Sequence, residues 1–233
     1  MPIIRLDKYV SVALNISRAD SKRFIQSGKI SVNGLCVKKS DYKVDINDMS
    51  VKYNNSLIDY KEFIYILMNK PSGILSASND KKAKTVVDII PQELKRDGLF
   101  PVGRLDKDTT GFLIITNDGD FAHKIISPKS NIQKRYYVEL DGNITDEMIE
   151  KFEKGIILAD GTQCMPARLE RTEGCRAFIT IKEGKYHQVK RMFGTVGLGV
   201  NKLHRISIGG LSLPDILEEG QCMELSMEEL LKI

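Results

Sequence analysis

The sequence predicts an α+β protein with a small N-terminal domain and a larger domain built on a mixed or antiparallel β-sheet. Three observations support this prediction. The chain opens with two short amphipathic segments and a tight turn, short apolar runs broken by glycine fill most of the remainder, and few helical patterns separate those runs. A length of 233 residues suits one medium and one small domain, and a hydrophobic content of 42% is sufficient for a core.

The N-terminal segment predicts two helices and a hairpin. Apolar side chains recur at helical spacing from Arg5 to Leu14, and Ser17 is well placed to cap a second helix from Arg18 to Ser27. The dipeptide Asn33-Gly34 lies between two short alternating runs, which is a strong signal for a two-residue hairpin turn. We expect this first domain to span residues 1–54.

Positive charge is concentrated in the same segment. Residues 1–50 hold nine Lys and Arg against five Asp, an excess of four that equals the net charge of +4 for the whole chain. Such a one-sided distribution favours a polyanionic partner, with RNA or DNA as the first candidates. A solvated charged surface is the alternative for each basic residue taken singly. The candidates for contact with phosphate are Arg5, Arg18, Lys22, Arg23 and Lys29.

A polar, turn-rich stretch at residues 55–61 is interpreted as a linker to a second domain of residues 62–233. Apolar or β-rich runs in this domain predict strands at 63–68, 112–116, 134–140, 177–181 and 203–208, and a turn is expected at 69–73, directly after the first of them. Helices are expected at 85–90, 145–154 and 186–193, with a further short helix after the turn at 117–119. Many strands with few helices between them favour the α+β class.

The loop from Phe100 to Thr116, FPVGRLDKDTTGFLIIT, is the most informative stretch of the second domain. Gly103 and Gly111 bracket a charged segment centred on Asp106, and a candidate buried strand follows directly. A glycine-bounded loop beside apolar strands is a common place to hold a carboxylate whose ionisation is controlled. On these residues alone, a solvated or turn-capping aspartate is the simpler alternative.

The complete set of motifs favours a functional carboxylate at Asp106 over a solvated or turn-capping one. The strings GRLDKDTTGFLIITNDG, KRYYV, EGKYHQVKRMF and HRISIGGLSL follow one another between Gly103 and Leu213. Together they resemble the pseudouridine synthases that modify ribosomal RNA and, among these, the RsuA-like branch. The helix-helix-hairpin order of the N-terminal segment resembles an S4 RNA-binding domain, which often precedes RsuA-like catalytic domains.

This resemblance implies roles for individual residues. Asp106 would be the catalytic carboxylate, and Tyr136 would lie against the uracil ring. The neighbouring Tyr137 is expected on the opposite face of the strand, in the core. Lys190, directly after the His-Gln-Val sequence, would be the basic partner that offsets the cost of placing an ionised carboxylate in a pocket without water. Three further residues are candidates for substrate contact, namely Arg104, Leu211 and Arg191.

The function that the resemblance implies is isomerisation of a specific uridine in 16S ribosomal RNA, at a site of the uridine-516 type. The same chemistry on 23S ribosomal RNA is one alternative, and a non-catalytic RNA-binding factor for ribosome assembly is another. A glycoside hydrolase that uses Asp106 and Asp108 is a third alternative. Residues two apart in an extended segment point to opposite sides, which argues against this last pairing.

Other classes of function have little support in the sequence. No run approaches the roughly 20 apolar residues of a membrane helix, and the N-terminus lacks a signal-peptide profile, so a cytoplasmic protein is expected. The glycines at 194–199 lack the order of a dinucleotide-binding motif, so no nucleotide cofactor is expected. The four cysteines have no zinc-site spacing and are expected to be free thiols, with no metal. We expect a monomer whose partner is ribosomal RNA.

Overall fold

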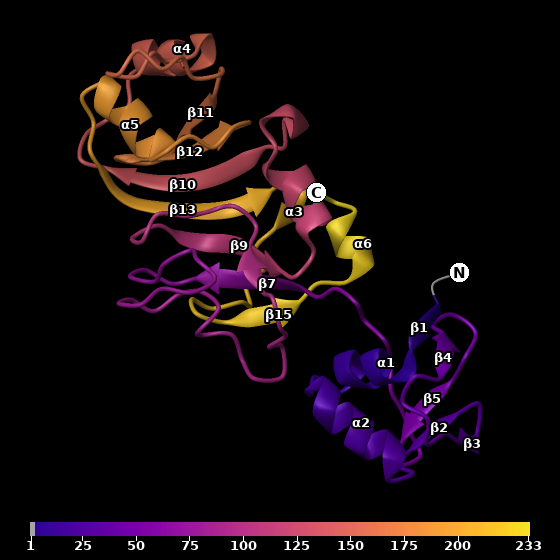
Figure 1. Ribbon diagram of the computed structural model, residues 1–233. Helices are drawn as coiled ribbons and strands as arrows, with labels where there is room; N and C mark the ends of the chain where they lie inside the picture. Colours follow the sequence, from indigo (N-terminus) through magenta and orange to yellow (C-terminus); the bar gives the residue numbers. More distant parts are fainter. Residues whose placement is uncertain (1–2) are drawn as a thin grey trace. The chain divides into compact units, whose positions relative to one another are not determined.

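The computed structural model describes residues 3–233 and divides into two compact units, Met1–Phe63 and Ile64–Ile233 (Figure 1). In the first unit, two helices pack on a small sheet in the order β3-β2-β5-β6 and on the strand pair β1-β4. Its elements are β1 (Ile3–Arg5), α1 (Leu6–Ala13), α2 (Arg18–Gln26), β2 (Ile30–Val32), β3 (Leu35–Cys36), β4 (Lys43–Asp45), β5 (Val51–Tyr53) and β6 (Ser56–Leu57).

The two helices and the hairpin of this unit form where the sequence predicts them. The apolar face of α1 is buried, and the Ser17 hydroxyl accepts a hydrogen bond of 3.1 Å from the backbone N–H of Asp20 at the start of α2. Asn33 and Gly34 have φ angles of 50° and 82°, and a type I′ hairpin turn requires positive φ at both positions. Local sequence signals therefore determine these elements.

The stretch expected to be a linker, residues 55–61, folds as part of the first unit. Ser56 and Leu57 form β6, which pairs antiparallel with β5. The side chains of Ile58 and Tyr60 pack against the same core as α1 and α2. The polar residues in this stretch mark the turn of a hairpin, and the division between the two units lies after Phe63.

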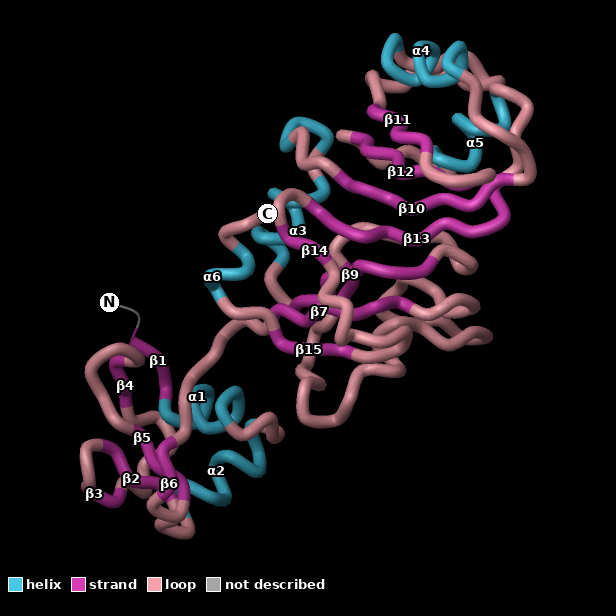
Figure 2. Tube along the Cα trace, turned by 180° about the vertical axis from the view of Figure 1, so that it is seen from behind, coloured by secondary structure: helices cyan, strands magenta, loops and turns pink. Residues whose placement is uncertain are grey.

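The second unit is built on one mixed sheet, ordered β11-β12-β10-β13-β9-β7-β15 along its main path, with β14 paired to β13 and β8 paired to β9 (Figure 2). The pair β9–β13 is parallel, and the other strand pairs within residues 64–233 are antiparallel. The predicted α+β class is confirmed. The strands are β7 (Tyr65–Lys70), β8 (Phe100–Pro101), β9 (Thr110–Thr116), β10 (Lys134–Leu140), β11 (Arg168–Arg171), β12 (Arg176–Ile181), β13 (Val200–Ile208), β14 (Leu211–Ser212) and β15 (Cys222–Glu224).

Helices cover both faces of this sheet, and β9 is buried between them. Phe112 and Ile114 belong to one core cluster with residues of α3 and α6, whereas Leu113 and Ile115 belong to another with residues of α4 and α5. Burial on both faces explains why the sequence of β9 is continuously apolar. The helices are α3 (Gly119–Ile126), α4 (Asp146–Lys154), α5 (Gln188–Thr195) and α6 (Met227–Leu230), and a 3-10 turn covers Pro128–Ser130 (Figure 1).

The parallel contact between β9 and β13 requires glycine at position 111. Gly111 is opposite Arg205 in the register of the two strands and has φ of 101°. A Cβ atom at this position would lie 2.3 Å from the carbonyl oxygen of Arg205. The glycine that closes the Asp106 loop in sequence therefore also allows the two strands at the centre of the sheet to approach each other.

The prediction of a helix at residues 85–90 is wrong, because this segment forms turns. Thr85 forms a parallel bridge with Leu75, and the Asp88 carboxylate accepts hydrogen bonds from both the backbone N–H and the hydroxyl of Thr85. Side-chain to backbone bonds of this kind compete with helix formation, and the β-branched residues of the segment also disfavour a helix.

Two further expectations about strands need correction. The strand expected at 63–68 continues into Asn69 and Lys70, which pair with β9 and do not form a turn. Tyr137, expected in the core, is half-buried on the face of β10 opposite to Tyr136, where it packs on the Phe178 ring. Side chains alternate between the two faces of β10, so Tyr136 and Tyr137 face opposite sides of the sheet. The end of β7 lies beside β9.

Candidate active site

Asp106 lies in the loop between β8 and β9, and hydrogen bonds fix the backbone on both sides of it. The Ser76 hydroxyl donates to the carbonyl oxygen of Leu105 at 2.9 Å and accepts from its N–H at 3.1 Å. The N–H of Thr109 donates to the carbonyl oxygen of Asp106 at 3.1 Å, which closes a turn. The Asp106 side chain is 25% exposed, so it is largely shielded yet still reachable from solvent.

Lys70, at the end of β7, fastens the second half of this loop. Its side chain is fully buried, and its ammonium donates to the carbonyl oxygens of Pro71, Lys107 and Thr109 at 3.0, 3.1 and 2.9 Å. Burial lowers the pKa of Lys70 to about 8, although nearby carboxylates oppose the shift. The lysine acts as a cross-link between the first strand of the unit and the loop that carries Asp106.

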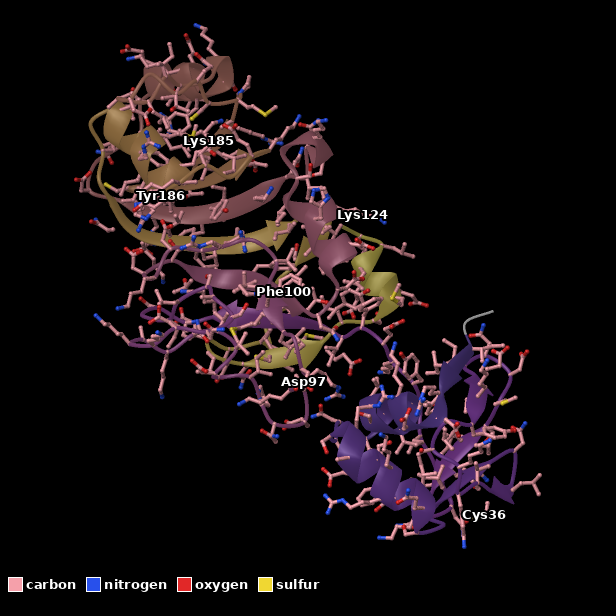
Figure 3. The ribbon with its side chains drawn as sticks, in the orientation of Figure 1. Cys36, Asp97, Phe100, Lys124, Lys185 and Tyr186 are labelled. Atoms are coloured by element: carbon pink, nitrogen blue, oxygen red, sulfur yellow. The ribbon has the colours of Figure 1, made fainter. Side chains whose placement is uncertain are left out.

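The N-terminal end of α5 brings two basic side chains to Asp106. Nε2 of His187 lies 3.4 Å from Oδ1 of Asp106, and Nζ of Lys190 lies 3.7 Å from Oδ2. The helix expected from residue 186 begins at Gln188, because His187 adopts a left-handed conformation with φ of 48°. Tyr186 is 76% exposed (Figure 3). Its ring stacks on that of His187, with the ring centroids 3.9 Å apart.

Lys190 is bound more closely by Asp108 than by Asp106. Its ammonium donates to both carboxylate oxygens of Asp108, at 2.6 and 2.7 Å, and this hydrogen bonding lowers the pKa of Asp108. The expectation that Asp106 and Asp108 point to opposite sides is wrong, because residues 106–109 form a turn and both acids approach one lysine. Asp108 is 70% exposed and does not line the cleft beside Asp106.

The cleft beside Asp106 has a volume of about 70 Å³ and is lined by both polar and apolar side chains. Tyr136 on β10, 7% exposed, and His187 share this lining with Asp106. The apolar part includes Ile181 and Leu203. A carboxylate, a phenol and an imidazole beside apolar walls suit a reaction on a flat base attached to a sugar. Lys190 contacts Asp106 from outside this lining.

The structure brings one of the three other candidates to the cleft. Arg104 is exposed and lines it. Leu211 does not, because it belongs to β14 and is buried in the core cluster with α3 and α6, while Leu203 lies against the cleft. Arg191 also points elsewhere, since its guanidinium pairs with Asp160. The expected substrate contacts of Leu211 and Arg191 therefore have no support in this geometry.

Comparison with known proteins identifies the family. Residues 64–195 match the family model for RNA pseudouridylate synthase, and residues 4–50 match the model for the S4 domain. The chain belongs to the RNA pseudouridine synthase family. Members of this family are isomerases. The synthase is 41% identical to an uncharacterized RNA pseudouridine synthase of Bacillus subtilis, over 97% of each chain.

Further relatives cover the synthase from end to end. It is 36% identical to ribosomal small subunit pseudouridine synthase A of Escherichia coli, over 99% of this chain and 100% of that protein. A crystal structure of a pseudouridylate synthase superimposes with a TM-score of 0.69 at 32% identity and covers 98% of this chain and 99% of that one. The similarity to these relatives therefore extends over both units of the synthase.

The basic residues of the S4 domain fall into two groups. Arg5 and Arg18 both bind the fully buried carboxylate of Asp7, at 3.0 and 2.7 Å. Burial alone would raise the pKa of Asp7, but hydrogen bonds from the two arginines outweigh burial and leave this pKa lowered. These arginines therefore have a structural task. The other three candidates are exposed on or beside α2, namely Lys22, Arg23 and Lys29.

Sequence reasoning missed four residues of the site. His187 was present in the string that identified Lys190, but it was given no role. Lys70 was assigned to a turn, although its buried ammonium holds the loop that carries Asp106. Gln188, whose amide bonds to Glu183 at 2.7 Å and to the N–H of Lys185 at 2.9 Å, fixes the start of α5. Leu203 lies directly before the string HRISIGGLSL, which contains Leu211, and was given no role.

Two classes of feature are absent from residues 3–233. No group of three or more His, Cys, Asp or Glu side chains is arranged to hold a metal ion. None of the helices in this range is both long enough and apolar enough to span a lipid bilayer.

Proposed function

We propose that this synthase converts a specific uridine of small-subunit ribosomal RNA to pseudouridine. The E. coli relative is named a ribosomal small subunit enzyme and matches the synthase over both complete chains. One structural observation carries the proposal. The carboxylate of Asp106 and the ring of Tyr136 line one cleft, and Lys190 is in ionic contact with that carboxylate. We further propose that the synthase acts as a monomer in the cytoplasm, where ribosomal RNA is modified.

The reaction needs few chemical groups. The N1–C1′ bond of uridine breaks, the base turns, and a bond forms between C5 and C1′. C5 loses a proton and N1 gains one, so no atom is added and no electron is supplied from outside. The enzyme must therefore provide a carboxylate at the sugar, a surface that holds the detached uracil, and a group that moves a proton.

Asp106 supplies the carboxylate. It acts either as the nucleophile at C1′ or as the base that removes a proton from the sugar, and both routes require its ionised form. Lys190, at 3.7 Å, supplies the positive charge that such an ionised group needs in a shielded loop, and the imidazole of His187 lies 3.4 Å from the same carboxylate. Asp108 holds Lys190 in place from the solvent side.

Tyr136 faces the base. Its ring is nearly buried in the cleft wall, so a uracil that stacks on it would be shielded from water while it turns. The phenol also provides an oxygen for the proton that leaves C5. Leu203 and Ile181 supply apolar contacts for the opposite edge of a flat ring.

The nucleotide must leave its stack before the cleft can receive it. Enzymes that break or form a bond to a base extrude that base, and Arg104, exposed at the cleft, would stabilise the extruded nucleotide. The exposed basic residues of the S4 domain would bind phosphates elsewhere on the same RNA. Two binding units on one chain raise the effective concentration of each at its own site.

Mapping of pseudouridine tests the proposal. Small- and large-subunit ribosomal RNA from cells that lack the protein would be treated with carbodiimide and read by primer extension, with purified synthase added back to each RNA. We expect one missing pseudouridine in 16S RNA, restored by the synthase. A missing site in 23S RNA would move the substrate to the large subunit. Complete profiles in both RNAs would leave only a non-catalytic role in assembly.

A further inference from the structure

A second cavity adjoins the catalytic cleft. It has a volume of about 270 Å³, and it shares Arg104, Tyr136 and Lys185 with the lining of the cleft. The two hollows therefore meet at the Tyr136 ring. The chemistry proposed above uses only the smaller one, which leaves the larger hollow without a role.

Arg205 lines this cavity and carries a buried donor that has no hydrogen-bond partner. The residue lies on β13, is 2% exposed, and its Nε donates to the carbonyl oxygen of Phe112 at 2.8 Å. Its Nη2 is buried and has no hydrogen-bond partner, while the guanidinium lies 6.0 Å from the centre of the Tyr136 ring. A buried guanidinium nitrogen without an acceptor is unfavourable, because it has lost its water and gained nothing in exchange.

Lys134 contributes a second cation to the same wall. It lies two residues before Tyr136 on β10, is half-buried, and donates one hydrogen bond of 3.1 Å to the carbonyl oxygen of Ile132. An ammonium carries three donors, so further donors remain available. Burial and the charge of Arg205 both lower the pKa of Lys134, as expected for two cations that share a shielded space.

The cavity offers these cations no free counter-ion. Among the described residues that line it, Glu183 is the one carboxylate, and it is already bound by the Lys185 ammonium, by Nε2 of Gln188 at 2.7 Å and by the N–H of Met165 at 2.9 Å. The positive side chains of the lining are Arg104, Lys134, Lys182, Lys185 and Arg205.

We propose that this cavity binds a backbone phosphate of the RNA strand, adjacent to the nucleotide whose base lies on Tyr136. The proposal rests on the function proposed above. A phosphate oxygen would satisfy Nη2 of Arg205 and the remaining donors of Lys134, and paired cations suit an anion with several acceptor oxygens. Because the two hollows meet at Tyr136, the bound phosphate would fix how deeply the RNA strand enters the cleft. It would thereby set the position of the uracil over Asp106.

The test compares two charge deletions in the full-length synthase. Lys134→Met removes the ammonium and keeps the side-chain length, while Lys202→Met makes the same change at an exposed position of β13 outside the cavity lining. For each protein, binding of a small-subunit RNA fragment is measured over a range of salt concentrations, and pseudouridine formation gives kcat and KM. A second set of fragments carries one uncharged methylphosphonate linkage, placed in turn on either side of the target uridine.

We expect Lys134→Met to raise KM roughly ten- to hundredfold with kcat little changed, and to lower the slope of log K against log salt by about 0.7 to 1. Lys202→Met should leave KM within about twofold. For the wild type, one methylphosphonate position should weaken binding as much as Lys134→Met does, and the two changes together should cost no more than either alone.

Two results would overturn the phosphate site. One is an unchanged KM and salt slope in Lys134→Met, and the other is a wild type that tolerates the methylphosphonate at both linkages. The second measurement involves no altered protein, so it decides the matter even if the variant is unstable. The binding arms require no turnover. A synthase that binds as expected but forms no pseudouridine would therefore refute the proposed function and leave the phosphate site standing.

Discussion

Lys190 donates hydrogen bonds to both carboxylate oxygens of Asp108, at 2.6 and 2.7 Å, and Asp106 lies within ionic contact of the same ammonium. Asp108 thus fixes a cation that α5 brings from 82 residues away in sequence. The two aspartates of this turn therefore differ in what they contact. The exposed acid positions the lysine, and the shielded acid faces the cleft.

Asp106→Asn should abolish pseudouridine formation while leaving folding and RNA binding nearly intact. The substitution keeps the shape of the side chain and removes the negative charge on which both chemical routes depend. We expect the rate to fall more than about 1,000-fold. Primer extension after carbodiimide treatment measures the product, and circular dichroism with filter binding supplies the controls. Normal product formation by this variant would remove Asp106 from the mechanism.

Replacement of Lys190 should lower kcat much more than replacement of Asp108. Lys190→Met leaves two carboxylates close together without their shared cation, and we expect kcat to fall about 100-fold. Lys190→Arg, which keeps the charge, should recover much of that loss. Asp108→Asn should change kcat less than about tenfold, because Asp108 only positions the ammonium. Equal losses at 108 and 190 would show instead that the exposed acid takes part directly.

Part of this site was predictable because its signals are local. Asp106 and Tyr136 each lie in a short contiguous motif, and the N-cap and hairpin of the S4 domain depend on neighbouring residues. Lys70 was not predictable in this way. Pro71, Ser72 and Gly73 follow it and suggest a turn, whereas the carbonyl oxygens that hold it include those of residues 37 and 39 positions further along the chain.

The choice between Leu203 and Leu211 shows the same limit. Both lie in one stretch, LHRISIGGLSL, whose apolar residues do not alternate strictly, so the sequence alone does not tell which of the two leucines faces the cleft. That is decided by long-range pairing, since Leu203 is opposite Val138 on β10, while Leu211 turns back to pair with Ile208. Periodicity gives the two faces of a strand, but the partner strand determines what each face meets.

Lys70→Met should change how stability depends on pH. The pKa of Lys70 in the folded protein is about 8, below its ordinary value of 10.5, so folding releases a proton between these pH values. The unfolded state binds more protons there, and wild-type stability therefore rises with pH through this window, while the burial penalty is present in full below pH 8. We expect the free energy of unfolding of the wild type, measured relative to that of Lys70→Met, to rise by up to about 3 kcal/mol across this pH window.

Urea unfolding of both proteins at several pH values between 7.5 and 10.5 measures this difference. Lys124→Met, at an exposed position of α3, is the matched control and should show the wild-type dependence (Figure 3). A constant difference between wild type and Lys70→Met at all pH values would mean that Lys70 stays charged and that burial does not shift it.

Gly111→Ala should prevent the parallel pairing of β9 with β13. The added Cβ would lie 2.3 Å from the Arg205 carbonyl oxygen, and the φ of 101° is one that alanine rarely adopts. We expect a loss of more than about 4 kcal/mol, or no folded protein at all. Gly98→Ala has φ of 75° and open space around its Cβ, so the same change should cost only about 1 kcal/mol. Urea midpoints that fall equally in the two variants would contradict the close approach of β9 and β13.

Arg18→Met and Lys22→Met, one helical turn apart on α2, should separate stability from RNA binding. Arg18 binds the buried Asp7 carboxylate at 2.7 Å, so its loss should cost about 1–3 kcal/mol. Because the pKa of Asp7 is lowered in the fold, this contribution is present at neutral pH and disappears as pH falls through that value. The difference in urea midpoint between wild type and Arg18→Met should therefore shrink in acid.

Lys22 is exposed, so Lys22→Met should leave the free energy of unfolding within about 0.5 kcal/mol of the wild-type value. If its ammonium contacts RNA phosphate, the same change should lower the slope of log K against log salt by about 0.7 to 1. Binding titrations of a ribosomal RNA fragment at several salt concentrations measure this slope. An unchanged slope in Lys22→Met, with a lowered one in Arg18→Met, would place the RNA on the arginine side of α2 and make Asp7 the residue that orients its contact.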